Sequence, residues 1–171
     1  YAFGHEDDAW LSKRFRFCTD GDMDAFLAMS DYQSKYKFGE ISHDFRDYFR
    51  GKTLFWQDIL MGQADEYLRC HPMSDFYSQA AEKFEKLALH NSKWQKHYTY
   101  INTIFRYLSL KCEIAEKLEP AYKNKDTAVL ASISKVQLPA LLKLTVLCHE
   151  QHKELWMEAN KPFGWETMDH H

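Results

Sequence analysis

The feature that most constrains the fold is an unbroken helical pattern between Tyr98 and Tyr122. The members of one row recur at spacings that alternate between three and four, which places them on a single face of an α-helix. All but one are apolar or aromatic, and the row is Tyr98, Ile101, Phe105, Leu108, Cys112, Ala115, Glu119 and Tyr122. A second row widens this face beyond that of a two-stranded coiled coil: Ile104, Tyr107, Ile114 and Leu118. We predict a helix over about 95–123, about 42 Å long, which Pro120 is expected to kink or end early.

Two further long helices are predicted, one before and one after this segment. Ser74, a favoured N-cap residue type, opens a helix over about 73–90. Its apolar row is Met73, Tyr77, Ala80, Phe84 and Leu87. The last helix, about 137–160, begins just before Pro139, which a first turn tolerates. Its stripe is Leu138, Leu141, Leu142, Thr145, Cys148, His152, Leu155, Trp156 and Ala159. Of these, we expect Leu141, Leu142, Cys148 and Leu155 to face the helix over 95–123.

Shorter elements account for most of the remaining chain. Residues 6–17 are predicted to form a short helix, because acidic residues lead and basic residues follow. Asp22 caps a second short helix, and Asp126 caps a third over 127–133. We expect loop and partial helix over 31–53, and an ordered, buried connector over 54–62. The prediction is therefore a single all-α domain over residues 1–171: an antiparallel helical bundle of three long helices with short N-terminal helices.

Composition and charge narrow the class of protein. Hydrophobic residues make up 45% of the chain, enough for an independent core. The net charge of −3 is mixed along the chain without a basic block, which argues against a nucleic-acid partner. Lys143 interrupts the longest apolar run, near 138–148, so we expect no membrane-spanning segment. The four cysteines are scattered, and we expect them to be reduced, as in a cytoplasmic protein.

No sequence motif for catalysis is evident. His149 and His152 are three residues apart, whereas the zinc-protease pattern needs histidines four apart and a third ligand, so we expect no metal site and interpret His152 as a packing residue. Asp7 and Asp8 are interpreted as acids of a first helical turn. There is no G-x-S-x-G, P-loop or G-x-G-x-x-G pattern. We predict no catalytic residue and no cofactor.

Two aromatic groups are the candidate interface residues. Pro162 stops the last helix, and Phe163 and Trp165 then flank Gly164 in a tail over 161–171, where they are expected to pack on something. Phe55 and Trp56 lie in the predicted connector. The aromatics of 32–56 could form a platform on which a carbohydrate stacks, or a surface that covers a neighbouring domain. We favour the second interpretation. We therefore predict that these four side chains contact another domain.

Several segments together resemble the helical C-terminal region of bacterial β-N-acetylhexosaminidases of glycoside hydrolase family 20. The segments follow the family's order, and the last two are the most specific. They are Trp10-Leu11-x-x-Arg14-Phe15-x-Phe17-Cys18-Thr19, Phe26-Leu27-Ala28-Met29-Ser30-Asp31, Leu54-Phe55-Trp56-Gln57-Asp58-x-Leu60-x-Gly62, Glu154-Leu155-Trp156 and Asn160-Lys161-Pro162-Phe163-Gly164-Trp165-Glu166-x-x-Asp169.

This resemblance implies a parent enzyme with a (β/α)₈ barrel that removes terminal N-acetylhexosamine, the substrate acetamido group acting as nucleophile beside an Asp-Glu pair. No position here matches that pair, so no catalytic residue is carried over. We expect a piece of a longer cytoplasmic enzyme, since Tyr1 is not an initiator Met and His170-His171 are either native or left from a purification tag. The expected role is structural support of the barrel, with subunit contacts in a homo-oligomer as a further role. The alternatives are an independent helical interaction module and a small-ligand or sugar-binding bundle.

Overall fold

The computed structural model describes residues 7–29, 51–62, 64–70 and 72–168, and every regular element in these ranges is helical. The predicted all-α class is therefore confirmed. The short helices before the long ones are α1 (Asp8–Thr19), α2 (Met23–Ala28), α5 (Gly51–Trp56) and α6 (Asp65–Cys70). The later elements are α7 (Ser74–His90), α8 (Gln95–Lys123), α9 (Thr127–Ser132), the π-helical turn η1 (Ile133–Gln137), α10 (Leu138–Ala159) and α11 (Trp165–Met168).

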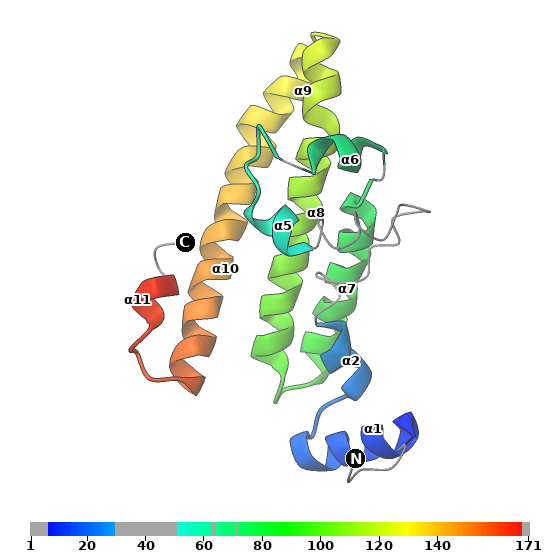
Figure 1. Ribbon diagram of the computed structural model, residues 1–171, viewed down its shortest axis with the longest axis vertical. Coiled ribbons are helices and arrows are strands. Elements are labelled where there is room, and N and C mark those ends of the chain that lie inside the picture. The colour runs from blue at the N-terminus through cyan, green and yellow to red at the C-terminus, as the bar shows by residue number, and fades with distance from the viewer. Residues whose placement is uncertain (1–6, 30–50, 63, 71, 169–171) are drawn as a thin grey trace.

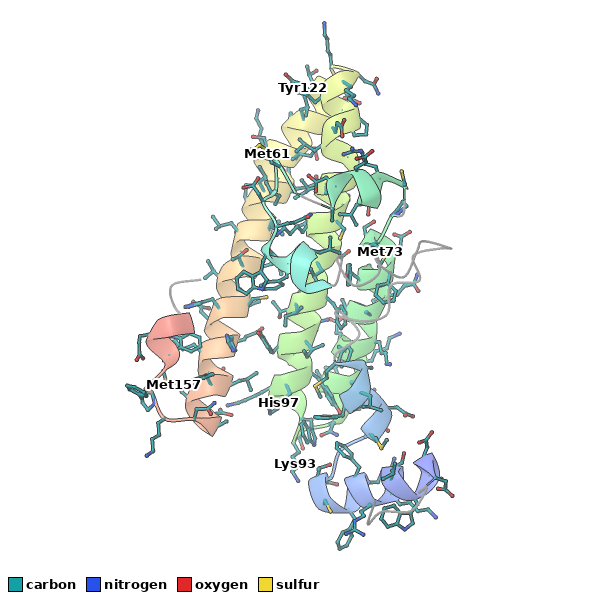
Figure 2. The ribbon with its side chains drawn as sticks, in the orientation of Figure 1. Met61, Met73, Lys93, His97, Tyr122 and Met157 are labelled. Atoms are coloured by element: carbon teal, nitrogen blue, oxygen red, sulfur yellow. The ribbon has the colours of Figure 1, made fainter. Side chains whose placement is uncertain are left out.

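The three long helices form a row with α8 in the middle (Figure 1). Successive helices run antiparallel: Lys93 and His97 mark the turn between α7 and α8, and Tyr122 marks the far end of α8 (Figure 2). α7 and α10 each pack along α8 and make little contact with each other, while α5 and α6 also pack on α8. The core is consequently built around one helix rather than shared equally among three.

α8 matches the predicted bounds and buries both predicted rows over most of their length. Phe105, Leu108 and Ile114 are each 0% exposed. Pro120 neither ends nor visibly shortens the helix, which continues to Lys123. Only one turn follows Pro120, and its own carbonyl still accepts the N–H of Asn124 at 3.0 Å, so the final turn closes without the missing proline N–H.

The last helix is longer than predicted. Instead of a separate helix over 127–133 and a second one from about 137, the chain forms one continuous helix over Thr127–Ala159, 33 residues long. The π-helical turn η1 lies directly before Pro139, and the N–H of Leu138 donates across it to the carbonyl of Ile133. A widened turn accommodates a proline that lacks an N–H, so Pro139 starts no new helix.

α10 buries only a narrow strip of its surface. Leu141 and Cys148 are buried, but Leu142, which we expected to face α8, is 65% exposed. That expectation was wrong because α10 has one long neighbour, and a single neighbour covers a narrower face than the sequence stripe provides. The helix Thr127–Ala159 is also long and apolar enough to span a bilayer, although this criterion of length and composition is weak evidence for a single helix. The expectation of no membrane span stays a prediction.

Candidate domain interface

The structure separates the four predicted interface residues into two kinds. Trp56 is 58% exposed and Phe163 is 86% exposed, whereas Trp165 is 6% exposed and Phe55 is half-buried. Each pair of neighbouring aromatics thus holds one ring against the helices and presents the other to solvent. The exposed member of each pair is available to a partner, and its contact with another domain stays a prediction.

Phe55 is held by a polar cluster at the end of α5. Its ring lies 4.8 Å from the ring of Tyr107 on α8. Its carbonyl accepts hydrogen bonds from Lys111 Nζ at 2.7 Å and from the hydroxyl of Tyr107 at 3.1 Å. A cation at the carbonyl end of a helix is favourable, and Lys111 is only 5% exposed. The buried ammonium therefore fixes α5 across the middle of α8.

Burial dominates the electrostatics of this cluster. Burial lowers the pKa of Lys111 to about 8, while the negative charges of Asp58 and Asp65 act in the opposite direction. Burial also raises the pKa of Tyr107 to about 12. The lysine therefore changes charge near pH 8, when the tyrosine is still neutral. Lys111 Nζ also donates to the hydroxyl of Tyr107 at 3.1 Å, and both groups donate to the carbonyl of Phe55, so we interpret them as structural.

The loop after α5 is closely hydrogen-bonded. Asp58 Oδ1 accepts the N–H of Leu60 at 2.7 Å and that of Met61 at 3.0 Å. These backbone hydrogen bonds are the main reason that the pKa of Asp58 is lowered. Asp65 accepts the N–H of Gly62 at 2.9 Å. Leu60 and Met61 of this loop are 67% and 84% exposed, and Met61 is labelled in Figure 2, so an ordered loop presents apolar side chains to solvent.

The C-terminal tail folds back onto α10. Gly164 has a φ of 98°, a conformation that favours glycine, and the turn brings α11 alongside α10 (Figure 1). The Trp165 ring lies 5.3 Å from His152, 5.5 Å from His149 and 6.2 Å from Trp156. The two histidines thus pack against an indole. The described residues hold no cluster of three or more His, Cys, Asp or Glu that could bind a metal ion.

Sequence reasoning missed a pocket between α6 and α8. Its volume is about 320 Å³, and Arg69 and Glu119 form an ion pair in its wall. The remaining lining residues are Leu60, Asp65, Ala115, Leu118 and Tyr122. The short α6 has no clear apolar period, so the sequence provided no signal for the helix that forms one wall.

The alternative of a sugar-stacking platform rests largely on residues outside the described ranges. Of the aromatics in 32–56, only Phe55 and Trp56 fall within them. The ring of Phe55 packs against Tyr107 of α8, so Trp56 provides the one exposed ring among the described aromatics of this segment. A platform of several rings is therefore not formed by the described residues.

Comparison with protein-family models identifies a match to this chain. A family model described as the Glycoside Hydrolase 20C C-terminal domain matches residues 24–171. The match covers the chain from within α2 to its end, including all three long helices. No curated protein matches the chain.

Proposed function

The chain belongs to the glycoside hydrolase 20C C-terminal domain family, and from this premise we propose that it is the helical accessory domain of a β-N-acetylhexosaminidase. The parent enzyme removes terminal N-acetylhexosamine from its substrates. The chain itself supports the catalytic barrel and contributes no acid, base or nucleophile to the reaction.

The observation that carries this proposal is the apolar surface on ordered elements. Trp56, Leu60 and Met61 are exposed on α5 and the loop that follows it, and Phe163 is exposed on the folded-back tail. The lysine and aspartate contacts described above hold the first group in place without burying it. An apolar surface on an ordered scaffold is typical of a contact with another protein or domain.

The proposal includes a cytoplasmic location. Cys18 and Cys70 are exposed, Cys112 and Cys148 are buried, and all four are free thiols. Exposed free thiols persist most readily in a reducing compartment, which supports this location.

A second candidate function is an interaction module that acts through α10. Leu142 and Val146 are 65% and 49% exposed on its outer side. Such a row fits the groove or helix of a partner protein, including a second copy of the chain. This candidate requires binding through α10 that is independent of a catalytic domain.

The test uses the full-length enzyme and a chromogenic N-acetylglucosaminide. We expect turnover by the full-length protein and none by this chain alone. The variants Trp56→Ser and Met61→Ser should lower the thermal midpoint of the full-length enzyme by several degrees, since burying an aromatic or Met side chain contributes about 1.5–3 kcal/mol. Leu89→Ser, at a residue 74% exposed on α7, is the control and should leave the midpoint unchanged.

Two results would contradict the proposal. A full-length protein without hexosaminidase activity would remove the assigned substrate class. Full-length variants that melt like the Leu89→Ser control would show that the surface around Trp56 does not support the barrel.

A further inference from the structure

Helix α1 is fully formed although none of its residues is buried. Asp7 Oδ1 accepts the N–H of Trp10 at 2.7 Å as an N-cap, and Asp20 closes the C-terminus in a left-handed conformation with a φ of 57°. Large apolar side chains are nonetheless exposed on it. Phe17 is 91% exposed and Trp10 is 42% exposed. A short helix without tertiary packing is only marginally stable in water. α1 would therefore become more stable if another surface covered its exposed aromatic side chains.

One side of α1 is anchored to the rest of the domain. The Phe15 ring lies 5.2 Å from Phe26 of α2, and Phe26 lies 6.0 Å from Trp94, which precedes α8. The indole N–H of Trp94 donates to the carbonyl of Thr19 at 3.2 Å. Gly21 allows this approach, because a Cβ there would come within 2.9 Å of Trp94 Nε1. α1 is therefore held at a defined angle beyond the lower end of the helix row (Figure 1).

The exposed aromatics lie on the opposite side of α1. Residues seven apart lie two turns apart on the same face of an α-helix, which places Trp10 and Phe17 together, away from Phe15. Arg14 lies between them, and its guanidinium carbon is 5.0 Å from the centre of the Trp10 ring. The outer face of α1, defined here as Trp10, Arg14 and Phe17, thus combines two aromatic rings with a stacked cation.

The family match describes a C-terminal domain, so another part of the enzyme precedes it in the chain. α1 is the first helix that the structure describes and is therefore near that preceding part in sequence. A helix at this end of the domain, attached by one side and apolar on the other, is suited to contact the part of the enzyme before it. That part is covalently linked to α1, so its effective concentration exceeds that of any separate partner.

We propose that the outer face of α1 docks onto the portion of the glycoside hydrolase that precedes the C-terminal domain. The two rings enter an apolar depression, and Arg14 pairs with a carboxylate or carbonyl at its edge. α1 then acts as a rigid joint between catalytic and helical domains. This inference rests on the proposed function and identifies a contact separate from the surface around Trp56.

Hydroxyl-radical footprinting of the wild-type full-length enzyme, analysed by mass spectrometry, tests the contact directly. Tyr122, which is 75% exposed at the far end of α8, is the internal reference. We expect Phe17, after correction for intrinsic reactivity, to be oxidised at least about fivefold more slowly than Tyr122, because the core of a docked interface excludes water. Oxidation of Phe17 as fast as that of Tyr122 would overturn the inference. Protection that appears only at high protein concentration would assign the face to a second copy and would also overturn it.

Variants of the full-length enzyme test the mechanical role. Phe17→Ser and Trp10→Ser should accelerate proteolytic cleavage around α1 severalfold, whereas Lys13→Ser, at an exposed polar position of the same helix, should not. Cleavage of all three at the wild-type rate would contradict the role of a joint, and the wild-type footprint decides the question if a variant fails to fold. Hexosaminidase activity measured on the same wild-type sample separates the two proposals. An active enzyme with an unprotected Phe17 rejects only this inference, and a protected Phe17 in an inactive protein rejects only the proposed substrate class.

Discussion

α8 and α10 both carry an apolar stripe, yet the two helices lie in different environments. Leu108 of α8 is 0% exposed, whereas Leu142 of α10 is 65% exposed. α8 has α7 on one side, α10 on the other, and α5 and α6 packed on it as well. α10 has α8 on one side and the small α11 against its C-terminal half. The pattern of a helix thus indicates which residues are apolar, while the number of neighbours determines how many become buried.

The same contrast recurs at smaller scale in the C-terminal tail. Trp165 and Phe163 are separated by a single glycine, but only the tryptophan finds a partner surface on α10. Local sequence cannot distinguish these two aromatics, because the direction of each ring follows from the turn at Gly164. Substitutions that compare buried with exposed members of matched pairs are therefore the most informative.

The largest effect is expected at the centre of α8. Phe105 is 0% exposed and stacks on Phe84 of α7 with ring centres 5.5 Å apart. Phe105→Ala should lower the free energy of unfolding by about 3–5 kcal/mol, because it leaves a cavity in the core. Urea denaturation measures this change, with Leu89→Ala as the exposed control. A loss below about 1 kcal/mol would mean that this row of α8 does not lie in the core.

A substantial but smaller effect than that of Phe105→Ala is expected in the tail. Trp165→Ala removes the contacts with His149, His152 and Trp156 and should cost about 2 kcal/mol, less than a core aromatic because one helix provides most of its contacts. Phe163→Ala, the matched control, should change stability by less than about 0.5 kcal/mol. Equal effects of the two substitutions in thermal or urea unfolding would show that the tail does not fold back in solution.

Lys111 should make stability depend on pH. Its folded pKa is lowered to about 8 from 10.5, so between these values the unfolded chain binds the extra proton and stability rises with pH. The slope is at most about 1.4 kcal/mol per pH unit. Burial raises the pKa of the Cys112 and Cys148 thiols above their ordinary 9.0, which opposes the rise above about pH 9.

The contribution of Lys111 is isolated by comparison with Lys111→Met. The thiols and Tyr107 are present in both proteins, so their titration cancels in the comparison. The free energy of unfolding of the wild type minus that of Lys111→Met should therefore increase between pH 8 and pH 10. Urea unfolding at three pH values within this range measures it, and Lys117→Met controls for the loss of an exposed lysine from the same helix. A difference that stays constant with pH would show that Lys111 does not lose its proton in the folded protein.

One of the smallest effects is expected for Leu142→Ala on α10, and the adjacent Leu141 provides the buried comparison. Leu141 is 6% exposed and Leu142 is 65% exposed. Leu142→Ala should change the stability of this chain by less than about 0.5 kcal/mol, whereas Leu141→Ala should cost about 2–4 kcal/mol. Repeating both substitutions in the full-length enzyme sharpens the comparison, because a partner seated on α10 would raise the cost of Leu142→Ala. Equal costs in this chain alone would refute the orientation of α10.

Much of the secondary structure follows from local patterns. The spacing of apolar residues placed α8 at the bounds observed, because that helix has a complete face and clear ends. The N-caps were also predictable, since Asp22 accepts the N–H of Ala25 at 2.8 Å and Asp126 accepts that of Val129 at 3.1 Å. These interactions join residues three apart, so they need no information about the rest of the chain.

The tertiary structure alone decided the features that depend on distant partners. Lys111 lies among apolar residues of α8, and only the carbonyl of Phe55, brought against it by the fold, explains its burial. The π-helical turn before Pro139 joined two predicted helices into one, because the backbone at η1 widened rather than broke. The interface residues divided in the same way: the sequence marked Phe163 and Trp165 alike, and the turn at Gly164 buried one and left the other free. Burial depends on which surfaces meet, and the sequence of one helix does not specify its neighbours.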